Sequence, residues 1–147
     1  APVTGQSAPM AYECAFRARI DHGAVTPVLS VTVPMATLCP CSKAISDFGA
    51  HNQRALTTLD LRLDASDDAH SMLWIEDLVA LVDEAASCPV FPLLKREDEK
   101  WVTERQYTNA KFVEDVARDV VLALRELPGL QGFAVKVEAS EGLPTQW

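Results

Sequence analysis

A cysteine pair and a histidine occur close together between residues 35 and 54, and these side chains are the best equipped in the chain to do chemistry. Cys39 and Cys41 flank Pro40, and His51 follows in the same stretch. This stretch fits neither the period of a strand nor that of a helix, and functional residues concentrate on loops held by a rigid scaffold. The spacing leaves two alternatives open, a metal site or a nucleophilic cysteine.

Pro40 bears on how the two cysteines are used. A residue before proline is extended, so Cys39 and Cys41 are predicted to project to opposite sides and not to chelate one ion together. A zinc ribbon needs two residues between its thiolates and a second such pair, and the chain has neither. One thiolate with His51 is the favoured combination. A further ligand must then come from elsewhere, and the acidic candidates are Glu97, Asp98, Glu99 and Glu104.

The remaining cysteines and histidines have ordinary interpretations. Cys14 and Cys88 are expected to be small buried hydrophobes. His22 falls in a predicted turn and His70 in a loop, so both are expected to be solvated.

Two charged features also have plain alternatives. Residues 95–100 could form a solvated charged turn. Glu114 precedes Arg118 by one helical turn, so an exposed ion pair would explain both residues.

The elements that position these residues follow from periodicity. Alternating apolar residues predict strands at Tyr12–Ile20, Val28–Val33, Thr57–Leu63 and Phe133–Val137, with Pro34 ending the second. Helical spacing predicts helices from Ser71 to Ala85 and from Ala110 to Leu127. The predicted fold class is α+β, in the order β-β-β-α-α-β, with two helices on one face of the sheet.

Size and charge limit the function classes. The 147 residues suit a single domain, and the net charge of −8 disfavours nucleic acid and anionic membranes as partners. We find neither a signal peptide nor a membrane-spanning run, which predicts a cytoplasmic protein with free thiols. A polyanionic ligand would need a local basic cluster, and the candidates are Arg54, Lys95, Arg96, Lys100 and Arg105.

Several short sequence motifs resemble those of one enzyme family. They are Leu38-Cys39-Pro40-Cys41-Ser42-Lys43, Ile45-Ser46, Gly49-Ala50-His51-Asn52-Gln53-Arg54, Leu93-Leu94-Lys95-Arg96, Asp98-Glu99-Lys100, Val102-Thr103-Glu104 and Lys111-Phe112-Val113-Glu114-Asp115. In this order they resemble the type IB GTP cyclohydrolases. The resemblance implies the tunnelling fold (T-fold), with residues 1–147 as one unit that corresponds to the carboxyl-terminal, catalytic-motif half of the family chain.

The resemblance also implies a site. Cys39, His51 and Glu99 would hold a divalent metal, with zinc, manganese or iron as the candidates, and a water activated there would attack the guanine of GTP. The products would be formate and 7,8-dihydroneopterin triphosphate, a precursor in folate biosynthesis. Glu114 would anchor the purine edge, and Cys41 would act near the site as a proton carrier. The basic residues available for the triphosphate are Lys43, Arg54, Lys95, Arg96 and Lys100.

Family chains assemble as homo-oligomers with active sites at the interfaces. They also contain a related amino-terminal half and a carboxyl-terminal His-x-His pair, and neither has a counterpart here. One alternative hypothesis is therefore an impaired, truncated relative that binds metal or purine as an assembly subunit. Another is the chemistry of the related nitrile reductases, in which a loop cysteine adds covalently to substrate.

Overall fold

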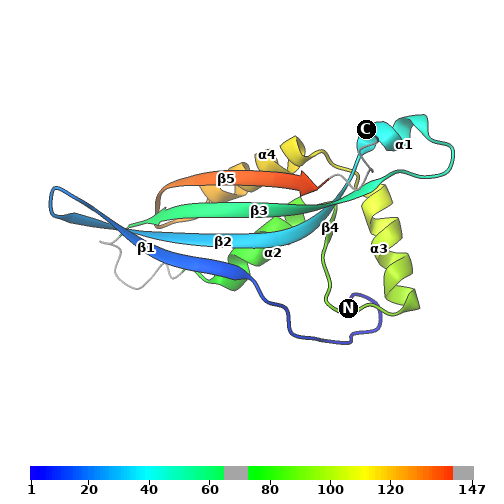
Figure 1. The fold of residues 1–147 in the computed structure, drawn as a ribbon, viewed down its shortest axis with the longest axis horizontal. Helices are drawn as coiled ribbons and strands as arrows, with labels where there is room; N and C mark the ends of the chain where they lie inside the picture. The colour runs from blue at the N-terminus through cyan, green and yellow to red at the C-terminus, as the bar shows by residue number, and fades with distance from the viewer. Residues whose placement is uncertain (65–72, 141–147) are drawn as a thin grey trace, which may run out of the picture.

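A long antiparallel sheet organises the molecule (Figure 1). The computed structural model describes residues 1–64 and 73–140. Within these residues the elements are β1 (Glu13–Asp21), β2 (Ala24–Leu38), α1 (Pro40–Ile45), β3 (Asn52–Leu63), α2 (Ile75–Ala85), β4 (Cys88–Pro89), α3 (Arg96–Thr108), α4 (Val113–Arg125) and β5 (Leu130–Ser140). The strand order is β1-β2-β3-β5, and the short β4 pairs with β2.

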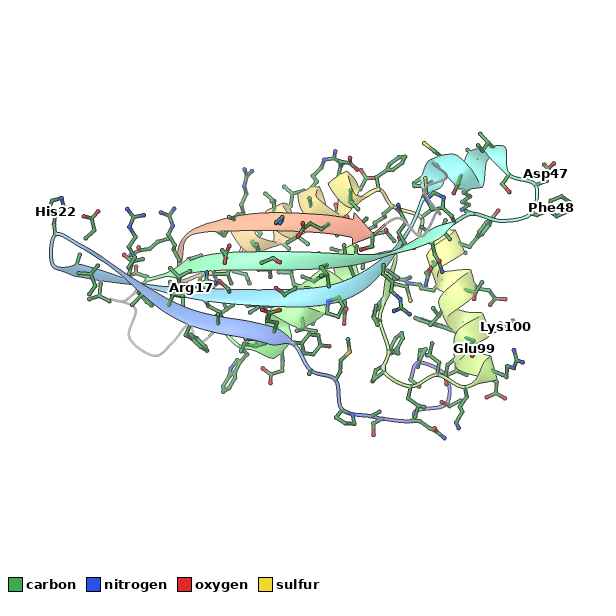
Figure 2. All side chains as sticks on the ribbon, in the orientation of Figure 1. Arg17, His22, Asp47, Phe48, Glu99 and Lys100 are labelled. Carbon is green, nitrogen blue, oxygen red and sulfur yellow. The ribbon has the colours of Figure 1, made fainter. Side chains whose placement is uncertain are left out.

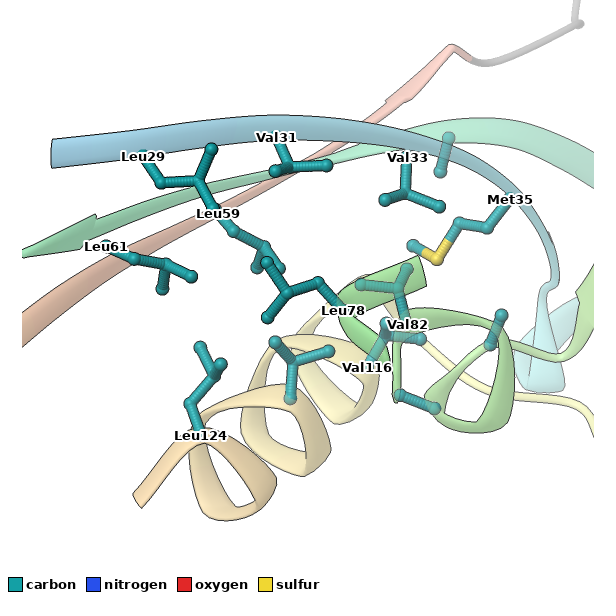
Figure 3. Packing of buried hydrophobic residues seen from close by; sticks show 14 residues of the cluster. Leu29, Val31, Val33, Met35, Leu59, Leu61, Leu78, Val82, Val116 and Leu124 are labelled. Atoms are coloured by element: carbon teal, nitrogen blue, oxygen red, sulfur yellow. The ribbon is translucent and has the colours of Figure 1, made fainter. Parts of the chain in front are cut away.

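Helices α2 and α4 cover one face of this sheet, and the hydrophobic core lies between the two layers (Figure 3). Strand residues such as Val31 and Leu59 meet Leu78 and Val82 of α2 and Val116 of α4, and all five are fully buried. Burying a side chain of this size stabilises a fold by about 1.5–3 kcal/mol. The predicted α+β class, with two helices on one face, is confirmed.

The second strand is longer than its sequence pattern predicts. Pro34 does not end it, because β2 continues to Leu38 and pairs Pro34 with Leu56 of β3. On its other edge, β2 pairs with β1 as far as Thr32 and with β4 from Met35. Pro34 falls between these two partners, where the missing N–H leaves no ladder bond unmade. The connection between β2 and β3 is thus shortened to residues 39–51, and it contains α1.

The first strand forms as predicted, but its apolar face is not buried. Phe16 is 74% and Ile20 72% exposed, and Cys14 is exposed as well, so its interpretation as a buried hydrophobe is wrong. The reason is that β1 lies at the edge of the sheet, outside the core that α2 and α4 cover, which includes none of Cys14, Phe16 and Ile20. Cys88, by contrast, is fully buried as predicted. His22 occupies the hairpin turn with φ 47° and is solvated, whereas His70 and Ser71 lie outside the described residues.

Three elements escaped the sequence patterns: α1, β4 and α3. The charged residues 95–100 are not a turn, because they form the start of α3. That helix fully buries only Asp98 and Gln106, so it has no apolar stripe from which to predict it. In the part of the chain that the structure describes, every helix is too short or too polar to cross a membrane.

Candidate functional site

Cys39 caps the amino terminus of α1, at the point where β2 ends. Its backbone is extended (φ −65°, ψ 115°), as expected before a proline, and Pro40 takes the first helical position. The Cys39 Sγ accepts a hydrogen bond from the backbone N–H of Ser42 at 3.5 Å. This bond is the main cause that lowers the pKa of the Cys39 thiol, against the raising effect of partial burial. A thiol with a lowered pKa is a better metal ligand and a better nucleophile.

Backbone bonds bring His51 back to Cys39 and close the loop. The Cys39 N–H donates to the His51 carbonyl at 3.2 Å. Ser42 Oγ donates to the Cys39 carbonyl at 3.0 Å and accepts from the His51 N–H at 3.2 Å. The structure therefore joins the backbones of the two predicted ligands through Ser42, which sequence reasoning did not single out.

Cys41 lies in the first turn of α1 and is exposed. The prediction that Cys39 and Cys41 project to opposite sides assumed an extended chain through Pro40, and this is wrong, because α1 begins at Pro40. The backbone N–H and the thiol of Cys41 also contribute to lowering the pKa of the Cys39 thiol. The chain turns into a helix at Pro40, which brings Cys41 round toward Cys39 where an extended chain would have separated them.

Glu99 and Asp98 lie side by side in the first turn of α3 but have different surroundings. The Glu99 carboxylate is exposed and pairs with Arg96 at 3.6 Å. Asp98 is fully buried and accepts hydrogen bonds from the backbone N–H groups of Val3, Thr4 and Lys95 and from the Thr4 hydroxyl. Burial raises the pKa of Asp98, but these bonds outweigh it and hold the pKa well below its usual range. Asp98 therefore anchors the amino-terminal segment and is not free to bind a metal.

Glu114 lies in the first turn of α4. The ion pair predicted between Glu114 and Arg118 is not the one that forms, because Arg118 pairs with Asp115 at 2.8 Å. Asp115 also accepts from the backbone N–H of Phe112 and so caps the helix. On a helix, an acidic side chain three positions before an arginine can pair with it as well as one four positions before it.

The predicted basic residues are spread over several elements. Lys43 is engaged by Tyr107, since its Nζ donates to the Tyr107 carbonyl at 2.6 Å and lies 4.3 Å from the ring centroid. Arg54 lines a cavity of about 300 Å³, together with Gln106 and apolar side chains that include Phe91. Lys100 pairs with Glu104 on the surface of α3.

Across residues 1–64 and 73–140, no three His, Cys, Asp or Glu side chains are grouped closely enough to hold a metal ion. Cys39 and His51 are joined at the base of the loop. Glu99 belongs to another element, and Figure 2 shows it with Lys100 on α3, away from Asp47 and Phe48 at the tip of the loop. The chain by itself thus brings together the backbones of two of the three predicted ligands.

Sequence reasoning also missed Ser87, Asn109 and Lys111, whose side chains bond to backbone groups distant in the chain. The one hint of Asn109 and Lys111 in the sequence is their place in the chain. Lys111 lies within the motif that contains Glu114, and Asn109 lies just before that motif.

The arrangement defines a class: an α+β protein with a cysteine of lowered pKa at the start of a loop that is closed by a bond to the His51 backbone. Comparison with known proteins makes this specific, because the family described as type I GTP cyclohydrolase folE2 matches residues 1–144. The chain belongs to this family.

The relatives matched include proteins named GTP cyclohydrolase FolE2. Those of Fervidobacterium nodosum and Thiobacillus denitrificans are 46% identical over 143 residues, and that of Desulfosudis oleivorans is 47% identical over 145 residues. Each alignment covers 97% of this chain but only 52%, 51% and 53% of the respective relative. The chain thus spans about half the length of the curated relatives it matches.

Proposed function

We propose that this chain carries the catalytic motifs of a GTP cyclohydrolase, which hydrolytically opens the guanine ring of GTP to give formate and 7,8-dihydroneopterin triphosphate. The observation that carries the proposal is the backbone connection of Cys39 to His51 through Ser42, with a lowered pKa of the Cys39 thiol, in a chain of this family. A cysteine and a histidine whose backbones are held together supply two donor types found in hydrolytic metal sites.

The donor set fits a divalent metal. Cys39, His51 and Glu99 would supply sulfur, nitrogen and oxygen, a mixture that suits zinc, manganese or iron. When bound, the metal would supply Lewis acidity that activates water for attack on the imidazole-ring carbon of guanine. Glu99 comes from a separate helix, and a second copy of the chain at a shared interface would be a source of this third ligand.

Other residues of the chain would bind and orient the substrate. Glu114 would accept two hydrogen bonds from the amino and imino groups of the purine edge, which a carboxylate can do in a bidentate manner. Its place in the first turn of α4 leaves the carboxylate free of Arg118. Cys41, exposed beside Cys39, would carry protons during ring opening and release of formate.

The triphosphate would meet basic side chains near these motifs. Arg54 is exposed at the cavity beside His51, and Lys95 and Arg96 begin α3. Lys43 is a weaker candidate because Tyr107 already engages its ammonium group.

We further propose a cytoplasmic homo-oligomer of T-fold units with active sites at the subunit interfaces, acting in folate biosynthesis. The open antiparallel sheet with two helices on one face supports the T-fold. The exposed Phe16 and Ile20 on edge strand β1 support an interface there. The net charge of −8 argues against nucleic acid and anionic membranes as partners.

The test is to incubate the chain with GTP and zinc, manganese or ferrous iron, and to measure formate release and the fluorescent pterin formed after oxidation. Turnover with at least one metal is expected. Nucleotide binding without formate release under every metal would contradict the proposal and favour a non-enzymatic assembly subunit.

A further inference from the structure

The end of β2 is bonded to a short backbone segment after α2. Leu38, the residue before Cys39, donates its backbone N–H to Ser87 Oγ at 3.3 Å. Ser87 is fully buried, and it follows Ala86, the carboxyl-terminal cap of α2. The position where the Cys39 loop leaves the sheet is therefore fixed by a side chain from residues 85–87.

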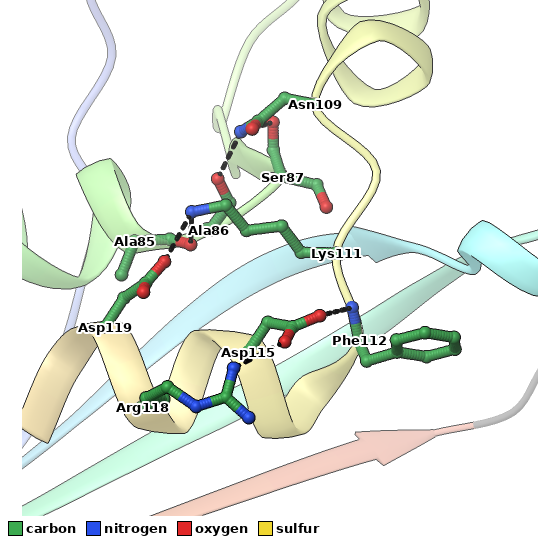
Figure 4. A network of polar contacts seen from close by, with 9 residues as sticks. All are labelled: Ala85, Ala86, Ser87, Asn109, Lys111, Phe112, Asp115, Arg118 and Asp119. Atoms are coloured by element: carbon green, nitrogen blue, oxygen red, sulfur yellow. Dashed lines mark hydrogen bonds and ion pairs between the residues drawn. The ribbon is translucent and has the colours of Figure 1, made fainter.

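The same segment is bonded from its other side (Figure 4). Asn109 Nδ2 donates to the carbonyls of Ala86 at 2.9 Å and Ser87 at 3.2 Å, and Lys111 Nζ donates to the carbonyl of Ala85 at 2.8 Å. Carbonyls at a helix end lack partners within the helix, and α2 has no basic residue in its last turn. Asn109 and Lys111 thus cap α2 from a distant part of the chain.

Asn109 and Lys111 lead directly into α4. Lys111 also pairs with Asp119 on that helix at 2.8 Å, and Asp115 caps its first turn through Phe112. Glu114 lies within this doubly fastened turn. A continuous set of bonds therefore runs from the residue before Cys39, through residues 85–87, to the turn that carries Glu114.

From this continuity we infer that Ser87, Asn109 and Lys111 are positioning residues that set the separation between Cys39 and Glu114. The inference rests on the proposed function, in which Cys39 would hold the metal near the reacting carbon and Glu114 would hold the purine edge. Both groups must act on one rigid ring system, and a misplacement of about 1 Å can lower a rate by about a hundredfold.

The test is a double-mutant cycle between Asn109→Ala and Glu114→Gln. A residue that acts only through Glu114 loses its effect once Glu114 is changed, whereas a residue that merely stabilises the fold lowers activity by the same factor in either background. We expect Asn109→Ala to lower kcat/KM for GTP by about tenfold to a hundredfold in the parent chain. In the Glu114→Gln chain the further loss should be less than about threefold.

Two controls separate position from stability. Leu124→Ala trims a buried core residue at the other end of α4 from these bonds, and activity per folded molecule should be unchanged. If Asn109→Ala fails to fold, Asn109→Asp replaces it, since this variant keeps the side-chain shape but loses the Nδ2 donor. Ser87→Ala is to be tested in the same cycle and should give the same pattern.

GTP binding to the metal-free chain, measured by calorimetry, gives a second cycle that does not depend on turnover. Weaker binding in each single variant, with little further loss in the double variant, would support the inference even without formate release. If the parent chain turns over GTP normally and the losses of Asn109→Ala and Glu114→Gln multiply in the double variant, the inference is overturned and the proposed function stands. Absence of both turnover and GTP binding in the parent chain would overturn both.

Discussion

The two segments that carry the candidate functional residues are held in different ways. The loop from Cys39 to His51 is closed by bonds among its own residues, chiefly through Ser42, and its tip reaches solvent with Phe48 fully exposed. Helix α4, which carries Glu114, is seated on the sheet by buried side chains such as Val116. Two of the residues proposed for metal binding thus lie on a locally stabilised loop, and the residue proposed for substrate anchoring lies on a helix seated on the core.

This difference predicts that function and stability can be separated. Local opening of a loop with few buried contacts costs far less free energy than opening of a packed core. Changes in the loop should therefore alter chemistry with little effect on global unfolding, and changes in the core should do the reverse.

The largest expected effect comes from Cys39→Ser. Serine is a good helix cap, so the unfolding free energy should change by less than about 0.5 kcal/mol. Metal affinity and formate release should fall by more than about a hundredfold, because residues that only orient a ligand already contribute 10- to 100-fold. Metal titration, GTP turnover and thermal unfolding measure the three quantities. Cys14→Ser, on exposed β1, is the matched control and should behave as the parent.

The second-largest effect is expected from Leu78→Ala, a change in the core that should lower stability and not chemistry. Leu78 is fully buried between sheet and helices, so its truncation should lower the unfolding free energy by about 2–5 kcal/mol. Ile45→Ala on α1 is the control, because Ile45 is 87% exposed and should change stability by less than about 0.5 kcal/mol. Chemical denaturation measures both. Equal losses in the two variants would contradict the comparison.

Ser42→Ala should produce a smaller effect confined to the loop. It removes the hydroxyl that bonds to the Cys39 carbonyl and the His51 N–H, each worth about 0.5–1.5 kcal/mol. The pKa of the Cys39 thiol should rise toward its ordinary value, though only partly, since the backbone N–H of Ser42 remains. Alkylation rates against pH, with the modified cysteine identified by mass spectrometry, test this. Ser42→Thr keeps the hydroxyl and should leave the thiol pKa where it is.

The contrast between core and loop also explains how far the sequence could predict the structure. The strands β2, β3 and β5 and the helices α2 and α4 bury one face each, so their apolar periods were visible, and the α+β class followed from them. The short α1 and the polar α3 have no such period, because hydrogen bonds and ion pairs fix them more than apolar burial. The predicted end of the second strand at Pro34 was wrong, because a proline interrupts a strand only where a neighbouring strand needs its N–H, and the sequence does not show which strands are neighbours.

The candidate site could be predicted as a set of residues but not as an arrangement. Cys39 and His51 were found from residue types and spacing, and Glu99 and Glu114 from the family resemblance, but neither source shows the bonds to distant parts of the chain. The partners of Leu38 and Ala86 lie 49 and 23 residues away in the chain. Such contacts between a side chain and a distant backbone leave no periodic trace, so residues like Ser87 and Asn109 become visible only in the fold.

The smallest predicted effect is a pH dependence that belongs to the core alone. Burial raises the pKa of Asp83 on α2 from 3.8 to about 6. An acid whose pKa is higher in the folded than in the unfolded state contributes most stability below the unfolded value and loses it as pH rises through about 6. Asp83→Asn, uncharged at every pH, should therefore match the parent near pH 4 and exceed it in Tm at pH 7.5. Because Asp83 is only half-buried, solvent screening should limit the difference to about 1 kcal/mol. Formate release per folded molecule should be the same in both proteins at each pH, and a shift in that profile would show that core and loop are coupled.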